Sequence, residues 1–111
     1  MGTTDLSPVE TIHHTTALWR WTAGNGVSWF FLRIEGDAGK ALAASALMRR
    51  LESGRARGFG MIKVRAEIGT SRWSTSVFPQ KTGGWLLPVK AAIRRAEAIG
   101  EGDMVELVLE F

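Results

Sequence analysis

The segment Ile62–Ile68 constrains the fold more than any other part of this sequence, because its residues alternate strictly between apolar and charged. A period of two is that of a β-strand with one buried face and one face in solvent. We therefore expect Lys63, Arg65 and Glu67 to point into solvent. The side chains that we expect in a core are Ile62, Val64, Ala66 and Ile68.

Other short stretches are rich in β-branched, aromatic and leucine residues, and turn residues separate them. Gly24-Asn25-Gly26 is the clearest turn, since Asn and Gly tolerate the positive φ of a tight hairpin. Strands of this length joined by hairpins are typical of small β-sandwiches and barrels. The stretches are Thr15–Ala23, Val27–Ile34, Arg72–Phe78, Trp85–Leu87 and Met104–Phe111.

Two segments have a helical pattern instead. The first, Gly39–Glu52, follows Asp37, which we expect to cap its N-terminus. The second runs from Pro88 to Ala98, with the proline in its first turn, where a missing N–H costs nothing. We expect the apolar stripe of the first helix to pack on the sheet. That stripe consists of Ala43, Ala46, Leu47 and Leu51, and the inward residues of the second helix are Val89, Ala92, Ile93 and Ala96.

The predicted order of elements is β-β-α-β-β-β-α-β. We expect a mainly β fold, a small closed or nearly closed β-barrel with two short helices. A chain of 111 residues suffices for one domain, which we place at residues 15–111, and we expect residues 1–14 to form a flexible arm. A small barrel needs bulky groups to fill it, so most of the five tryptophans should pack in the core or at the rim.

The composition excludes several classes of site. The chain has no cysteine, which rules out disulfides, thiolate metal sites and cysteine nucleophiles. No apolar run approaches the roughly 18 residues of a membrane span, so we expect no membrane partner and a cytoplasmic location. The net charge of +3 and the pI of about 10.0 are compatible with a polyanionic partner, but such a charge is also usual for solubility.

The second half carries two motifs that occur as a pair. A strand ending in Ile68-Gly69 precedes the strand Trp73–Pro79, which reads Trp-x-Thr-Ser-Val-Phe-Pro. After a glycine-rich turn come Leu-Pro-Val-Lys, a helix with a basic pair, and Gly102-Asp103. Together they resemble the bacterial family described as domain of unknown function 1905, over about residues 15–111, with Val77 where the family usually has leucine. The resemblance implies a small β-barrel with no established enzymatic activity.

The Gly102-Asp103 pair after a short helix is also similar, more distantly, to the half-barrel of AbrB-type DNA-binding regulators and to the Gly-Asp box of double-psi barrels. Local chemistry explains such a pair. Gly102 permits a sharp backbone turn, and Asp103 can accept backbone N–H groups within it. We therefore expect these two residues to have a structural role.

A small-ligand site is the functional interpretation that we favour. Lys90 and Arg94 are four apart, hence on one face of the predicted helix, and Trp73 and Thr75 lie on the motif strand. Two cations beside an indole and a hydroxyl would suit an anionic ligand with an apolar body at the barrel mouth. The alternative for the cations is that they extend over the barrel rim into water.

Nucleic-acid binding is the first alternative. The segment Ser53–Gly60 carries Arg55, Arg57 and Phe59, a mixture of basic and stacking side chains that is typical of single-strand binding surfaces.

Enzymatic activity of unknown class is the second alternative, and we predict no catalytic residues, no cofactor and no metal site. The hydroxyls of Ser74, Thr75 and Ser76 have no recognisable base, and no phosphate-binding loop or nucleophile elbow is present in the sequence. The favoured interpretation is therefore a non-catalytic binding module whose partner is a small anionic molecule.

Overall fold

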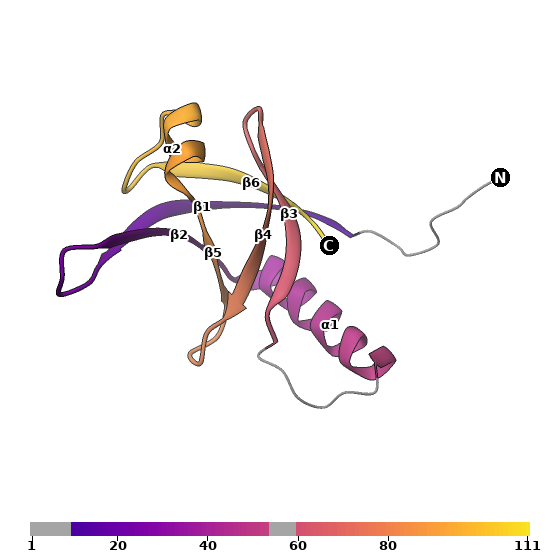
Figure 1. Ribbon diagram of the computed structural model, residues 1–111. Helices are drawn as coiled ribbons and strands as arrows, with labels where there is room; N and C mark the ends of the chain where they lie inside the picture. The colour runs from indigo at the N-terminus through magenta and orange to yellow at the C-terminus, as the bar shows by residue number, and fades with distance from the viewer. Residues whose placement is uncertain (1–9, 54–59) are drawn as a thin grey trace.

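The computed structural model describes residues 10–53 and 60–111, which form a closed, mainly β barrel with six strands and two helices (Figure 1). The order of elements is the predicted one. The helices are α1 (Gly36–Ser53), between β2 and β3, and α2 (Ala91–Glu97), between β5 and β6. The strands are β1 (Thr11–Thr22), β2 (Ser28–Ile34), β3 (Ile62–Ile68), β4 (Ser71–Pro79), β5 (Trp85–Pro88) and β6 (Met104–Glu110).

The strands close in the order β1-β2-β5-β4-β3-β6, and every neighbouring pair is antiparallel. β1 belongs to two pairings, because its first half pairs with β6 and its second half with β2. It also begins earlier than we predicted. Thr11–His14, which we assigned to the arm, pair with the end of β6, and Ile12 packs against the core. The polar composition of Thr11–His14 gives no strand signal, because their pairing with β6, far away in the sequence, is what makes them part of β1.

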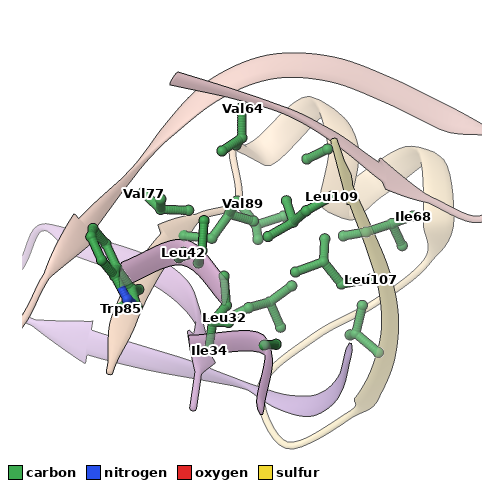
Figure 2. Packing of buried hydrophobic residues seen from close by; sticks show 14 of the residues in the cluster. Leu32, Ile34, Leu42, Val64, Ile68, Val77, Trp85, Val89, Leu107 and Leu109 are labelled. Carbon is green, nitrogen blue, oxygen red and sulfur yellow. The ribbon is translucent and has the colours of Figure 1, made fainter. Parts of the chain in front are cut away.

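The core lies inside the barrel, where β3 has the predicted alternation. Its four inward side chains are at most 5% exposed, whereas Lys63 and Arg65 are exposed. Figure 2 shows apolar side chains from strands β2 to β6, and Leu42 from α1, gathered in one interior. At about 25 cal/mol per Å² of buried apolar surface, this cluster is the main favourable contribution to folding.

Of the predicted apolar stripe of α1, Ala46 packs against the core, but Ala43, Leu47 and Leu51 are exposed, so the prediction is wrong for most of the stripe. Leu47 and Leu51 are 51% and 68% exposed, and the helix instead buries Ala38, Gly39 and Leu42. The helix begins at Gly36, so Asp37 lies in its first turn and is not the cap. The helix packs on the barrel through Ala38, Leu42 and Ala46, and its C-terminal end projects beyond the barrel (Figure 1).

Trp85 explains this attachment, because its buried indole Nε1 donates a hydrogen bond to the carbonyl oxygen of Gly39 at 3.1 Å. A side chain at Gly39 would press against the Ile34 carbonyl, 3.1 Å from the position of a Cβ, so glycine permits the close approach of helix and strand. The first turns of α1 are therefore tied to β2 and β5.

The second helix, unlike the first, starts later than predicted. Pro88 ends β5 instead of opening the helix, and Lys90, with φ −73° and ψ 160°, is the residue that precedes the first helical turn. Val89 and Ile93 are buried as predicted, whereas Ala92 and Ala96 are exposed. The buried side chains of Val89, just before the helix, and Ile93, within it, therefore hold α2 over one end of the barrel.

The chain returns from α2 to β6 through Gly102-Asp103. Gly102 has φ 89°, and its N–H donates to the Leu18 carbonyl at 2.7 Å. The Asp103 carboxylate accepts the N–H of Gly100 at 2.8 Å. Both residues thus organise the turn and join it to β1, which is the geometry that a structural role requires.

Candidate ligand-binding groove

A groove of about 360 Å³ opens where β5 stops between its two neighbours. β5 has four residues, whereas β2 and β4 both continue past its end. The chain leaves β5 at Pro88, passes through the buried Val89 and enters α2, which forms the floor of the groove. In Figure 1 this is the region where the upper part of β4 runs beside α2. The described residues that line it are Ser28, Trp29, Phe30, Trp73, Ser74, Thr75, Pro88, Val89, Lys90, Ala91 and Arg94.

The groove brings together all four residues that we selected from the sequence, namely Trp73, Thr75, Lys90 and Arg94. Trp73 and Thr75 alternate with Ser74 along β4 and are half-buried, and Trp73 packs against the core. Lys90 is exposed, and Arg94 is half-buried one helical turn later. Strand pleat and helical period therefore direct these side chains to one place.

Arg94 is held in a defined position. Its guanidinium carbon lies 3.7 Å from the centroid of the Phe30 ring, which is a close cation–π contact. Its Nε donates a hydrogen bond to the Val89 carbonyl at 3.3 Å. Both contacts use the base and one face of the guanidinium, so the terminal amino groups remain available to an acceptor in the groove.

No acid balances the two cations of the groove within the described residues. None of the residues that line it is Asp or Glu, and neither Lys90 nor Arg94 forms an ion pair in the described part of the chain. The hydroxyls of Ser28, Ser74 and Thr75 add further hydrogen-bonding groups to the walls. The groove is thus a site with two positive charges, hydroxyls and aromatic walls.

Phe30, Trp29 and Ser28 were not among our predicted site residues. They come from β2, which pairs with β5. The two strands are far apart in the sequence, so no local pattern indicates that they are neighbours. The sequence carries a weak signal for Phe30. Phe30, Leu32 and Ile34 are each two residues apart, so they share the inner face of a predicted strand.

Three of the five tryptophans are buried or half-buried, as we predicted for most of them. Trp85 is buried and Trp19 and Trp73 are half-buried, but Trp21 and Trp29 are 49% and 45% exposed. The two exposed rings stack on each other across β1 and β2, with centroids 5.2 Å apart. Part of their apolar surface is therefore covered by the partner ring instead of by the core.

The basic face of β3 and β4 is largely neutralised. Arg72 lies 3.2 Å from Glu67, and Arg65 lies 3.9 Å from Glu110. These pairs are solvent-exposed, so each contributes little to stability, but they reduce the positive potential of this face. The residues of the nucleic-acid alternative, Arg55, Arg57 and Phe59, lie outside the described residues.

Residues 10–53 and 60–111 contain no cluster of three or more His, Asp or Glu side chains that could hold a metal ion. Neither α1 nor α2 combines the length and the apolar character that crossing a membrane requires.

A comparison with protein families supplies the classification. The model of the family described as Domain of unknown function (DUF1905) matches residues 14–109. The chain belongs to the DUF1905 family. No curated protein matches the sequence. The resemblance that we drew from the motifs of the second half is thus confirmed, and the closed barrel is the fold in which this DUF1905 sequence places them.

The motif residues of this DUF1905 chain divide into two groups. Trp73 and Thr75 line the groove, whereas Gly69 builds the turn before them.

The Glu97 carboxylate at the end of α2 accepts hydrogen bonds from the Ser71 hydroxyl at 2.6 Å and the Thr70 hydroxyl at 3.4 Å. This contact, which we call the Glu97 clip, ties α2 to the β3–β4 turn and so fixes the floor of the groove relative to its β4 wall.

Proposed function

We propose that this chain is a non-catalytic binding module of the bacterial cytoplasm that holds a small anionic ligand with an apolar body in the groove. The observation that carries the proposal is the placement of Lys90 and Arg94 beside Trp73 with no acid among the described residues of the lining. Unpaired cations in a concave, partly apolar site favour an anion, since an anion relieves their mutual repulsion.

Preorganisation strengthens this argument. Phe30 and the Val89 carbonyl hold the Arg94 guanidinium in place before any ligand arrives. A ligand therefore does not have to immobilise a free arginine side chain, which would otherwise cost about 0.5–1.5 kcal/mol. A fixed guanidinium also favours carboxylate or phosphate groups, because it can donate two parallel hydrogen bonds to them.

The size of the groove limits the ligand. A volume of about 360 Å³ lies near the lower end of the range of about 300–1,000 Å³ that is usual for small-molecule sites. A single aromatic or branched acid fits this space, and a dinucleotide cofactor does not. The indole of Trp73 supplies the wall against which a planar or branched body would pack.

The test is a thermal-shift and tryptophan-fluorescence titration with inorganic phosphate, benzoate and phenyl phosphate. We expect at least one organic anion to raise the melting temperature of the parent and to alter its tryptophan emission, since Trp29 and Trp73 both line the groove. The variant Lys90→Ala/Arg94→Ala should keep its fold and lose this response. The matched control, Lys63→Ala/Lys81→Ala, removes two exposed positive charges elsewhere and should respond like the parent.

Two results would overturn the proposal. An equal response of the parent and the groove variant would place the anion elsewhere on the barrel. Absence of any response to the anions, together with single-stranded DNA binding that weakens steeply as salt rises, would assign the chain to nucleic-acid binding instead. The paired arginines of β3 and β4 weigh against that alternative, because their charge is already compensated.

A further inference from the structure

The outward side of the β1–β2 hairpin carries aromatic rings where a barrel usually has polar side chains. Leu18 and Leu32 lie opposite each other and are completely buried, so they mark the inward side of the two strands. Side chains alternate along a strand, so the residues next to these leucines point outward. We call this outward surface the aromatic face. It consists of Trp19, Trp21, Trp29 and Phe31.

Cross-strand pairing arranges the four rings in two rows. Trp21 lies opposite Trp29, and Trp19 lies opposite Phe31, with ring centroids 5.2 and 5.3 Å apart. Trp21 and Trp29 are 49% and 45% exposed, so almost half of each side chain remains in solvent. The end of the hairpin extends away from the rest of the barrel (Figure 1). The aromatic face is therefore accessible to a partner.

Lys90 borders the aromatic face at Trp29. The N–H of Val89, just after β5, still donates to the Phe30 carbonyl of β2 at 2.9 Å. Lys90 is itself extended, with φ −73° and ψ 160°, so it continues the line of β5 by one more residue. Lys90 is therefore the neighbour of Trp29, and both residues also line the groove.

Arg33 borders the aromatic face at Trp19. Its guanidinium carbon lies 5.4 Å from the centroid of the Trp19 ring, and it forms no ion pair within residues 10–53 and 60–111. β1 and β2 contain no Asp or Glu. Of the acids near their ends, Glu101 is paired with Arg20 at 3.6 Å, and Glu35 follows the end of β2. The aromatic face therefore has a positive border.

The size and the charge of the aromatic face argue against a second copy of this chain as its partner. With roughly 150–250 Å² for each aromatic side chain, Trp21 and Trp29 present about 140–240 Å², and the half-buried Trp19 and Phe31 add less. A stable interface needs about 800 Å² from each partner. Pairing with a second copy would also bring together two surfaces that are both positive. A small, flat and negatively charged partner fits better.

We infer that the aromatic face binds a short stretch of single-stranded nucleic acid. Bases stack on Trp21 and Trp29, and phosphates meet Arg33 and Lys90, which is the combination of rings and cations that single-strand binding surfaces use. The planar bases suit the open rings, and the phosphates complement two cations that have no acidic partner on these strands. This inference goes beyond the proposed function, because it assigns a second partner to a surface that only adjoins the groove.

The first experiment measures stacking. Fluorescein-labelled thymidine and uridine octamers are titrated with the full chain and followed by anisotropy, which also shows whether DNA or RNA binds better. We expect Trp21→Ala to bind about tenfold more weakly, the loss that follows when one base loses its stacking partner. Trp21→Phe, which keeps a ring, should recover most of the affinity. The matched control, Leu51→Ala, removes an exposed apolar side chain from α1. A Trp21→Ala variant that binds like the parent would overturn the inference.

The second experiment counts phosphate contacts. The logarithm of the affinity for a single strand falls with the logarithm of the salt concentration by about 0.7 per neutralised phosphate, so two contacts predict a slope of about −1.4. We expect Arg33→Gln to bring this slope to about −0.7. Lys63→Gln, on the exposed side of β3, is the matched control and should leave it unchanged. A parent slope several times steeper, or no change in Arg33→Gln, would place the strand elsewhere and overturn the inference.

The outcomes are separate from those of the proposed function. Trp21 and Arg33 do not line the groove, so both variants should keep the response to benzoate or phenyl phosphate. If these anions bind and the octamers do not, the groove stands and this inference fails. If the octamers do not bind and light scattering shows a dimer that Trp21→Ala dissociates, the aromatic face is an interface between copies instead. If neither the anions nor the octamers bind, both proposals fail.

Discussion

The Glu97 clip provides the most informative test of the packing between α2 and the β3–β4 turn. Gly69 has φ 58°, and a Cβ at this position would overlap the Glu97 carboxylate. The substitution Gly69→Ala therefore has two separate effects. It strains the backbone, and it displaces the carboxylate from the hydroxyls of Ser71 and Thr70.

The magnitudes follow from these contacts. An alanine in the left-handed region costs about 1–2 kcal/mol. Loss of the hydrogen bonds to Glu97 costs about 1–2 kcal/mol, the lower part of the range for charged partners, because the carboxylate is half-exposed. We expect Gly69→Ala to cost about 2–4 kcal/mol and Glu97→Ala alone about 1–2 kcal/mol. Since the first change already breaks the clip, Glu97→Ala should add almost nothing in the Gly69→Ala background.

Urea unfolding followed by tryptophan fluorescence measures the four free energies of this cycle. Gly102→Ala is the matched control for strain, because Gly102 also has positive φ, 89°, but no atom lies within 4 Å of its added Cβ. It should cost about 1–2 kcal/mol and show no coupling to Glu97. If the costs of Gly69→Ala and Glu97→Ala simply add, the clip is not the contact that the glycine protects, and the reasoning is refuted.

Three further predictions use the same assay. Val64→Ala should lower the free energy of unfolding by about 1–3 kcal/mol because it leaves a cavity, whereas Lys63→Ala should change it by less than about 0.5 kcal/mol. Equal costs would contradict the assignment of Val64 to the buried face of β3 and Lys63 to the exposed face. Leu42→Ala should cost about 2–5 kcal/mol and Leu51→Ala less than about 0.5 kcal/mol, and the reverse order would mean that the other face of α1 is packed. Asp103→Ala should cost about 1 kcal/mol through loss of the Gly100 N–H partner, and an unchanged midpoint would deny Asp103 its part in the turn.

Much of the fold could be predicted because the strand signals are local. The alternation of Ile62–Ile68 depends on neighbours along the chain, and so does the Gly24-Asn25-Gly26 turn between β1 and β2. Each signal is complete within about ten residues, and the order of elements follows from reading them in turn. Closure into a barrel follows from the number of short strands and their hairpin connections.

The errors arose where one segment offered two apolar faces. α1 carries Leu42 on one side and Leu47 and Leu51 on another, and the sequence pattern alone favours the longer stripe. Trp85 and Ile34 decide between the faces, because they hold Gly39 against the barrel and leave the longer stripe outside. Ile34 and Trp85 belong to strands, so the sequence of the helix alone does not show which of its faces is buried.

Only part of the candidate site could be predicted from the sequence, for a similar reason. Trp73 and Thr75 share one strand face, and Lys90 and Arg94 share one helical turn, so each pair is defined locally. Their convergence depends on the pairing of β4 with β5, a hairpin that the sequence also predicts. The β2 wall, with Phe30 beneath Arg94, depends on a pairing across a long connection and could not be read in this way.

The proline of the Leu-Pro-Val-Lys motif connects these observations. Pro88 lacks the N–H with which a strand would continue its ladder, and it is the last residue of β5. The N–H of the buried Val89 still donates to the Phe30 carbonyl of β2 at 2.9 Å, and α2 begins at Ala91. Lys90 lies between them and lines the groove. One short motif thus ends the strand, leads into the helix that covers the barrel, and sets a positive charge beside Trp73 and Thr75, which is the arrangement that the proposed anion site requires.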